Sequence, residues 1–189
     1  MSKNVESKLK YIILLRGINI SGKNKIAMSE LKNVLQESGF NNVTTCLNSG
    51  NVILESNIES RETLGRKIAE IIKEKFQLEI PVFVTTQVEL EDVLNNSPDW
   101  WDTNDKNIYD NLIFVIPPSN YKEIFTTVGE PSKNIDKIQE YKNHIFWSFD
   151  LKNYKKSNWW IKTASTNIKD KITTRTANTV KKILNLCQK

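Results

Sequence analysis

The stretch YIILLRGINISGKNKIAMSELKNVLQESGF, residues 11–40, has a long basic loop between an apolar run and an amphipathic segment. The apolar run, Tyr11–Leu15, has the length and composition of a buried strand. The amphipathic segment, Met28–Gly39, has apolar residues at helical spacing, with Ser29 as a candidate N-cap and Gly39 as a C-terminal stop. The stretch therefore predicts the strand-loop-helix opening of an α+β domain.

The residues that follow predict a ferredoxin-like first subdomain. Three more strands are expected, at Asn42–Leu47, Asn51–Glu55 and Pro81–Thr85. A second helix is expected between the last two of them, at Ser60–Phe76. The sequence Asn48-Ser-Gly-Asn51 suits the hairpin turn between the first two of these strands, because Asn and Gly tolerate positive φ. The resulting β-α-β-β-α-β order is the ferredoxin-like arrangement, and we assign it to residues 1–88.

The second half, residues 89–189, predicts a smaller α+β subdomain that repeats part of this order. Its expected elements are a helix at Gln87–Leu94, a strand at Leu112–Ile116, a helix at Tyr121–Thr127, strands at Lys137–Tyr141 and His144–Phe149, and a basic C-terminal helix with the apolar stripe Ala177, Val180, Leu184 and Cys187. A basic loop is expected to precede that last helix. The two halves show no close sequence repeat.

The basic residues are concentrated near the C-terminus. The chain of 189 residues has a formal net charge of +5, but Glu91–Asp150 holds eleven acids and five bases, whereas Leu151–Lys189 holds ten bases and one acid. Such asymmetry can mark a surface that faces an anion. It can also arise without an anionic partner, if the two segments neutralise each other or if the frequent Lys, Asn and Ile residues reflect AT-rich codons.

Several classes of chemistry lack their usual residues. His144 is the sole histidine, and Cys46 and Cys187 are far apart in the sequence, so we expect neither a structural zinc site nor a Ser-His-acid triad. The phosphate-loop, dinucleotide-binding and nucleophile-elbow motifs are absent. We identify no catalytic residue, expect no metal or cofactor, and leave open an enzyme of another type. Two isolated thiols without a signal peptide or a membrane span predict a cytoplasmic protein.

The loop Arg16–Lys25 is the candidate binding site. It follows a strand and enters the N-terminus of a helix, where backbone N–H groups and the helix dipole favour an anion. Arg16, Lys23 and Lys25 would supply positive charge. Asn19, Asn24 and backbone amides would orient a small anionic ligand, such as a nucleotide or a phosphorylated metabolite. The alternative is a solvated loop whose lysines only keep the protein soluble. The full set of candidate ligand-binding residues is Arg16, Asn19, Gly22, Lys23, Asn24, Lys25, Ser49, Asn51, Arg175 and Asn178.

Two other polar segments carry the remaining candidates. We expect the Asn48–Asn51 turn to reach the basic loop only if that loop folds back, because the end of the first strand and the start of the third are expected at opposite ends of parallel neighbours. Thr173–Thr179 is expected to start the last helix, with Thr173 or Thr174 as its cap. Arg175 and Asn178 would then lie one turn apart on one face of that helix. Capping and turn formation alone would also account for both segments.

Two further functions compete with anion binding. Nucleic-acid binding by the basic segment Lys152–Lys189 is the second hypothesis, because Trp159 and Trp160 lie among lysines in KKSNWWIK. The alternative for these tryptophans is that one of them packs in a small satellite core. The third hypothesis is an interaction or scaffold role, through a sheet edge or the Trp100–Trp101 loop. The sequence does not indicate the oligomeric state.

The long run LLRGINISGKNKIAMSELKNVLQESGFNNVTTCLNSGNVIL resembles the opening of the bacterial domain-of-unknown-function family 1697. The close, Thr173–Val180, is similar to the TTRNWNTV-like ending of that family, except that Thr176 and Ala177 replace the usual Asn-Trp. The resemblance implies an α+β fold with a ferredoxin-like N-terminal part, and it implies no activity. It also implies that the following residues occupy family motif positions: Arg16, Asn19, Gly22, Lys23, Asn24, Ser49, Gly50, Asn51, Arg175 and Asn178.

Overall fold

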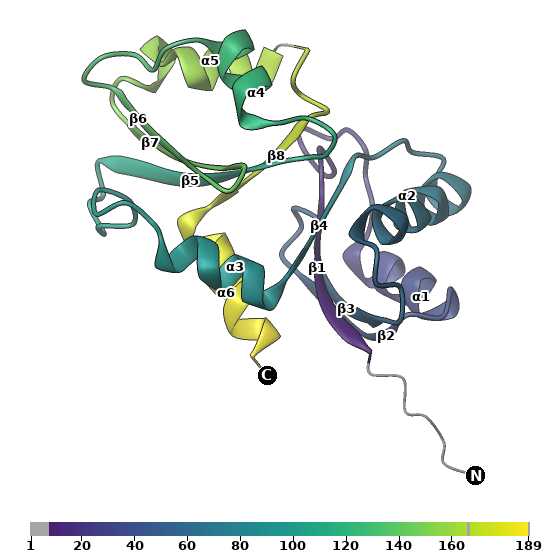
Figure 1. Cartoon of the computed structure of the whole chain (residues 1–189). Helices are drawn as coiled ribbons and strands as arrows, with labels where there is room; N and C mark the ends of the chain where they lie inside the picture. The colour runs from purple at the N-terminus through teal and green to yellow at the C-terminus, as the bar shows by residue number, and fades with distance from the viewer. Residues whose placement is uncertain (1–7, 166, 189) are drawn as a thin grey trace. The chain divides into compact units, whose positions relative to one another are not determined.

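The computed structural model describes residues 8–165 and 167–188, which form two compact units. Within the described residues, the first unit ends at Val88 and also includes Cys187, and the second runs from Glu89 to Leu186. Each unit contains one four-stranded antiparallel sheet together with helices (Figure 1). The chain therefore belongs to the α+β class, as its sequence predicts.

The elements of the first unit follow the predicted β-α-β-β-α-β order. They are β1 (Leu9–Leu15), α1 (Met28–Glu37), β2 (Asn41–Cys46), β3 (Asn51–Ser56), α2 (Arg61–Phe76) and β4 (Val82–Thr86). The strands lie in the order β2-β3-β1-β4. Helices α1 and α2 cover one face of this sheet (Figure 1), and the core between helices and sheet contains the fully buried side chains of Ile13, Leu35 and Ile68.

The helix ends of the first unit follow local capping rules only in part. Ser60 caps α2, because its hydroxyl accepts a hydrogen bond from the backbone N–H of Thr63 over 3.2 Å. Gly39 follows α1 with φ of +92°, a conformation that glycine tolerates. The predicted cap of α1 is wrong: Ala27 occupies the N-cap position, and Ser29 lies inside the first turn. Ala27 has no polar side-chain atom, so it cannot satisfy the first N–H groups of α1.

The second unit repeats the order of the first. Its elements are α3 (Gln87–Asn95), which begins at the unit boundary, followed by β5 (Ile108–Val115), α4 (Tyr121–Val128), β6 (Asp136–Tyr141), β7 (His144–Asp150), the short 3₁₀ helix η1 (Tyr154–Lys156), α5 (Asn158–Ser165), β8 (Ile172–Thr176) and α6 (Ala177–Cys187). The strand order is β6-β7-β5-β8, which matches the pattern of the first sheet element by element. Its core includes Trp147 of β7 and Trp159 of α5, together with Ile124 and Val128 of α4.

Two expectations for the C-terminal region are wrong. Ile172–Thr176 is a strand, not the start of a helix: Thr173 is buried and pairs with Phe114 of β5, and Thr176 takes the capping role through a 3.3 Å bond from the backbone N–H of Thr179. A run of β-branched residues favours the extended chain. The expected basic loop instead contains η1 and α5, and α5 begins directly after Ser157.

None of the helices in the described part of the chain combines the length and the apolar character that a membrane span requires.

Candidate functional site

The loop between β1 and α1, residues 16–27, has an unusual backbone. Positive φ angles occur at Gly17, Asn19, Ser21, Gly22 and Asn24. Glycine and, less readily, asparagine adopt this left-handed conformation, whereas most other residues are strained in it. The Gly- and Asn-rich composition of the loop is therefore explained by its backbone shape, before any ligand is considered.

Asn19 fixes the shape of this loop. Its Oδ1 accepts a hydrogen bond from the backbone N–H of Ile26 over 2.9 Å, and its Nδ2 donates to the carbonyl oxygens of Ile26 and Asn48, each over 2.9 Å. Asn24 adds a second closure, because its Nδ2 donates to the carbonyl of Gly17 over 3.1 Å and its carbonyl accepts from the backbone N–H of Asn19. The side chains of Asn19 and Asn24 thus cross-link the backbone of the loop through hydrogen bonds.

The turn Leu47–Gly50 lies directly beside the basic loop. Strands β1 and β3 are antiparallel neighbours with Leu14 opposite Asn51, so the end of β1 meets the start of β3. The prediction of parallel neighbours with these points at opposite ends is therefore wrong. The backbone N–H of Leu15 donates to the carbonyl of Gly50 over 2.8 Å, and the loop reaches the turn again through Asn48.

Gly50, the last residue of this turn, and Asn51, the first residue of β3, both maintain the shape of the turn. A Cβ atom at Gly50 would lie 2.8 Å from Cβ of Leu15 and 2.9 Å from Cδ1 of Ile18, which explains why only glycine fits. Asn51 is buried, and its Nδ2 donates to the carbonyl of Cys46 over 2.7 Å and to the hydroxyl of Ser49 over 3.0 Å. The side chain of Asn51 therefore holds the two ends of the turn together. Ser49 is exposed, so of the two candidate ligand-binding residues in this segment it is the one that solvent can reach.

Positive charge remains on the outside of the loop. Lys23 and Lys25 are exposed, and Arg16 is partly exposed. Residues 16–27 contain no acid, and the first acidic residue downstream is Glu30, in the first turn of α1. Because Ala27 provides no side-chain cap, the first N–H groups of α1 are available to solvent or to an anion.

The matching connection in the second unit shows that the fold does not require such a loop. β1 ends at Leu15 and α1 begins at Met28, which leaves 12 residues, whereas β5 ends at Val115 and α4 begins at Tyr121, which leaves five. The shorter connection contains no basic residue. It is nevertheless tied to its neighbouring hairpin turn by an asparagine, because Asn143 accepts from the N–H of Tyr121 over 2.6 Å.

The structure brings eight of the ten candidate residues together in the first unit: Arg16, Asn19, Gly22, Lys23, Asn24, Lys25, Ser49 and Asn51. The other two belong to the second unit. Arg175 is a buried residue of β8 whose Nη1 donates to the hydroxyl of Thr173 and the carbonyl of Thr174, each over 2.8 Å. Asn178 is exposed in the first turn of α6, so the expected pairing of the two on one helix is wrong.

The aromatic residues that suggested nucleic-acid binding separate into two roles. Trp159 is fully buried, and its Nε1 donates to the carbonyl of Gly129 over 3.1 Å, which confirms a packing role for one of the two tryptophans. Trp160 is 41% exposed. The sequence interpretation missed Tyr109 and Tyr154, which lie in the same region of the second unit as Trp160. Within residues 8–165 and 167–188, no three His, Cys, Asp or Glu side chains gather where they could hold a metal ion.

The family described as "Protein of unknown function (DUF1697)" matches residues 9–146. The chain belongs to this family. The match covers the basic loop and the Leu47–Gly50 turn, whereas Arg175 and Asn178 lie beyond it. Ala177, where this chain departs from the TTRNWNTV-like ending, is buried, so this position packs in the present chain.

Among solved structures, the chain is similar to the conserved bacterial protein SP0830 from Streptococcus pneumoniae. The two share 26% sequence identity with a TM-score of 0.83, over 96% of this chain and 99% of that protein. A comparison with curated proteins finds no match. Family membership and this likeness support a conserved bacterial protein of unknown function.

Proposed function

We propose that this protein binds a small anionic ligand, of the nucleotide or phosphorylated-metabolite class, on the loop Arg16–Lys25. The observation that carries the proposal is that this loop lies in the connection of residues 16–27, which has 12 residues against five in its counterpart in the second unit and is held in one shape by Asn19. Long connections in compact domains are commonly functional. A preformed loop also binds with a smaller loss of conformational entropy than a flexible one.

The charges of the loop support an anion over a neutral ligand. Lys23 and Lys25 supply two exposed cations, and Arg16 supplies a guanidinium group whose planar donors match phosphate oxygens. The N-terminus of α1 adds N–H groups and a positive dipole end. Asn19 and Asn24 act as positioning residues here, because their amides already bond to the loop backbone.

A thermal-shift screen at about 0.15 M salt tests the proposal, with nucleotides, sugar phosphates and inorganic phosphate as probes. A probe at about one hundred times its Kd should stabilise the folded protein by about 2.7 kcal/mol. Lys23→Gln/Lys25→Gln should abolish the shift. The matched control is Arg66→Gln/Lys75→Gln, which removes the same charge from exposed positions on α2 and should keep the shift.

Other results of this screen would favour one of the two competing functions, nucleic-acid binding or an interaction role. A shift with oligonucleotides alone that vanishes at higher salt would favour the basic segment Lys152–Lys189. No shift with any probe, together with a concentration-dependent dimer or complex, would favour the interaction role. A reducing, cytoplasmic location is part of the proposal, and the two cysteines, Cys46 and Cys187, support it as buried free thiols.

A further inference from the structure

Exposed hydrophobic side chains gather at one end of the second unit. In the described chain, eight large hydrophobic side chains are exposed, and four of them come from adjoining segments of this unit: Tyr109 of β5, Leu151 after β7, and Trp160 and Ile161 of α5. Single exposed hydrophobic residues need no explanation, but a group of them indicates an interaction surface.

Four aromatic rings in this region form a continuous row, which we call the aromatic platform: Tyr109, Phe149, Trp160 and Tyr154. Successive ring centroids are 5.3, 5.4 and 5.2 Å apart. Phe149 is buried, Tyr154 is partly exposed, and Tyr109 and Trp160 are 39% and 41% exposed. The platform therefore leaves parts of three rings, those of Tyr109, Tyr154 and Trp160, exposed to solvent around the buried ring of Phe149.

A buried carboxylate fixes the platform in place. Asp136, only 8% exposed, accepts a 2.6 Å bond from the hydroxyl of Ser157 and a 3.1 Å bond from Nε1 of Trp147. The same Ser157 hydroxyl accepts from the backbone N–H of Trp160 over 2.9 Å. Ser132 ties the neighbouring chain down as well, because its hydroxyl donates to the carbonyl of Lys156 over 3.1 Å. The exposed rings are thus preorganised, not attached to a loose loop.

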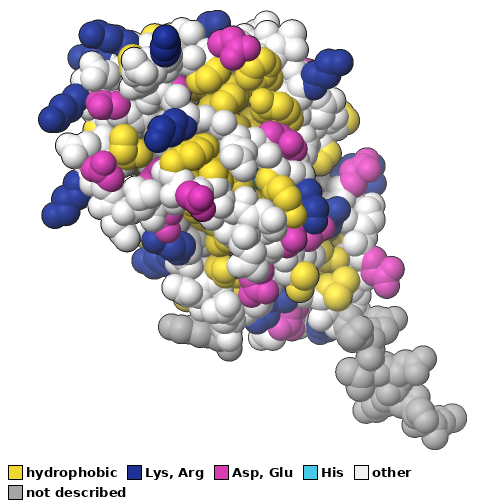
Figure 2. Space-filling view, turned by 60° about the vertical axis from the view of Figure 1, so that its left-hand side comes forward, with side chains coloured by type: hydrophobic (Ala, Val, Ile, Leu, Met, Phe, Trp, Pro, Cys, Tyr) yellow, Lys and Arg dark blue, Asp and Glu magenta, His cyan; other side chains and the backbone are white. Residues whose placement is uncertain are grey.

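The platform has a basic border. The segment Leu151–Lys162 contains four lysines and no acid. Three of these lysines are exposed and have no ion pair in the part of the chain that the structure describes: Lys152, Lys155 and Lys156. Nζ of Lys155 lies 6.0 Å from the ring centroid of Tyr154. Figure 2 shows hydrophobic side chains gathered on one face, with both basic (Lys, Arg) and acidic (Asp, Glu) side chains among and around them.

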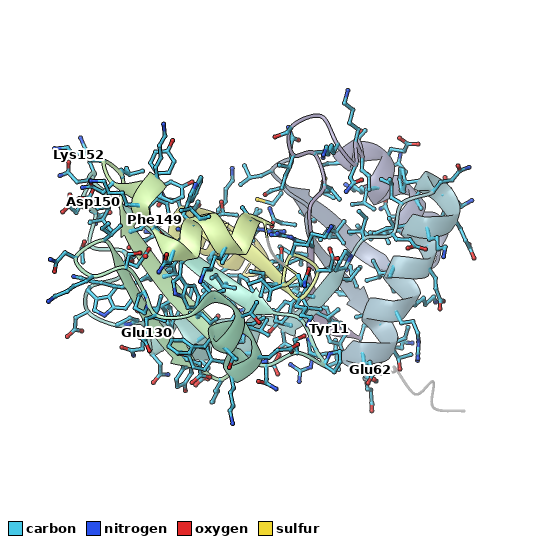
Figure 3. The ribbon with its side chains drawn as sticks, turned by 90° about the horizontal axis from the view of Figure 1, so that it is seen from above. Tyr11, Glu62, Glu130, Phe149, Asp150 and Lys152 are labelled. Carbon is cyan, nitrogen blue, oxygen red and sulfur yellow. The ribbon has the colours of Figure 1, made fainter. Side chains whose placement is uncertain are left out.

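The nearest carboxylate in sequence, that of Asp150, forms no ion pair with these lysines in the part of the chain that the structure describes. Asp150 is occupied by the turn that follows β7, where its Oδ1 accepts from the backbone N–H groups of Lys152 and Asn153 over 2.7 and 3.0 Å. Figure 3 shows Phe149, Asp150 and Lys152 in succession at this end of the unit. Within the segment Leu151–Lys162, lysines therefore provide all of the charged side chains.

We propose that the aromatic platform binds single-stranded nucleic acid. Unpaired bases can stack on the exposed rings of Tyr109, Tyr154 and Trp160, while Lys155 and Lys156 neutralise the adjoining phosphates. Charge complementarity selects a polyanion over a neutral peptide or a second copy of this basic chain. A duplex is a poor fit, because its bases are stacked on one another and cannot meet the rings. This site is independent of the basic loop of the first unit.

Fluorescence anisotropy of a labelled oligothymidylate of about 15 nucleotides, titrated with the full chain over a range of salt, tests this site. Lys155→Gln/Lys156→Gln removes two phosphate contacts, so the slope of log K against log salt should fall by about 1.4. The matched control, Lys122→Gln/Lys137→Gln, removes the same charge from exposed positions elsewhere in the unit and should leave the slope unchanged. All four lysines are exposed, so both variants should fold.

Stacking is tested separately. Trp160→Ala should weaken oligothymidylate binding about 5- to 150-fold, the range for loss of one stacked base. Lys23→Gln/Lys25→Gln in the basic loop should not weaken it. No binding at low salt, a duplex bound as tightly as the single strand, or equal losses in the platform and control variants would overturn the proposal. Small-anion binding that survives Trp160→Ala leaves the loop proposal standing on its own.

Discussion

Replacing Asn19 tests whether one side chain determines the shape of the basic loop. Asn19 makes two part-buried hydrogen bonds with Ile26 and one exposed bond to Asn48, each 2.9 Å long. The part-buried bonds are worth about 1 kcal/mol each and the exposed bond less, so their loss should cost about 2 kcal/mol. Asn19 also has φ of +54°, where alanine is strained by about 1 kcal/mol. Asn19→Ala should therefore lower the free energy of unfolding by about 3 kcal/mol.

Two companion variants separate these effects. Asn19→Gly loses the same hydrogen bonds without the backbone strain, so it should cost about 1 kcal/mol less than Asn19→Ala. Asn19→Asp keeps the acceptor for Ile26 but loses both donated bonds. Urea unfolding followed by circular dichroism measures the free energy of unfolding of all three variants. In a thermal scan the alanine variant should melt about 6–12 °C lower than the original protein. A loss below about 1 kcal/mol for alanine, or a glycine variant as damaged as the alanine variant, would refute the reasoning.

Three further predictions follow from packing and protonation. Gly50→Ala should destabilise the protein by about 2–4 kcal/mol in urea unfolding, because its Cβ would lie 2.8 Å from Cβ of Leu15 at a φ of +78°; an unchanged midpoint would contradict the close packing. Burial lowers the pKa of His144, so the folded state binds its proton more weakly than the unfolded state, and stability should fall as the pH drops below about 6.5. NMR of this sole imidazole measures its pKa directly, and His144→Phe should flatten the pH dependence of the unfolding free energy. Ser157→Ala should cost about 2–3 kcal/mol, because it removes a cap from α5 and a hydrogen bond from the buried carboxylate of Asp136; a loss below about 0.5 kcal/mol would show that the bond is replaced.

Local patterns account for most of the first unit. The apolar run before Arg16, the helical spacing after Met28 and the Asn-Gly turn chemistry before Asn51 each predict the observed element, because each is decided by residues close in sequence. The location of the basic loop between a strand and a helix was predictable for the same reason. The bonds of Asn19 to Asn48 were not, since they join residues 29 positions apart.

The errors arise where tertiary contacts compete with local signals. Thr173 suggested a helix cap, but pairing with β5 places it in a buried strand. The lysines around Trp160 suggested a loop, but Asn158–Ser165 is the helix α5. Ser157, which precedes it, is a typical N-cap residue, and the buried residues Trp159 and Thr163 have the i, i+4 spacing of one helix face. The aromatic platform was not predicted because its rings come from four elements, β5, β7, η1 and α5, that meet only in the folded unit.

The most direct test of anion binding is an NMR titration of the ¹⁵N-labelled protein with inorganic pyrophosphate at about 0.15 M salt, where exposed charges more than about 8 Å apart are screened. We expect saturable shifts confined to the backbone amides of Ser21–Lys25 and of the first turn of α1, with no response in the Lys23→Gln/Lys25→Gln variant. Shifts spread evenly over exposed lysines of both units, or none at all, would contradict a specific anion site on this loop.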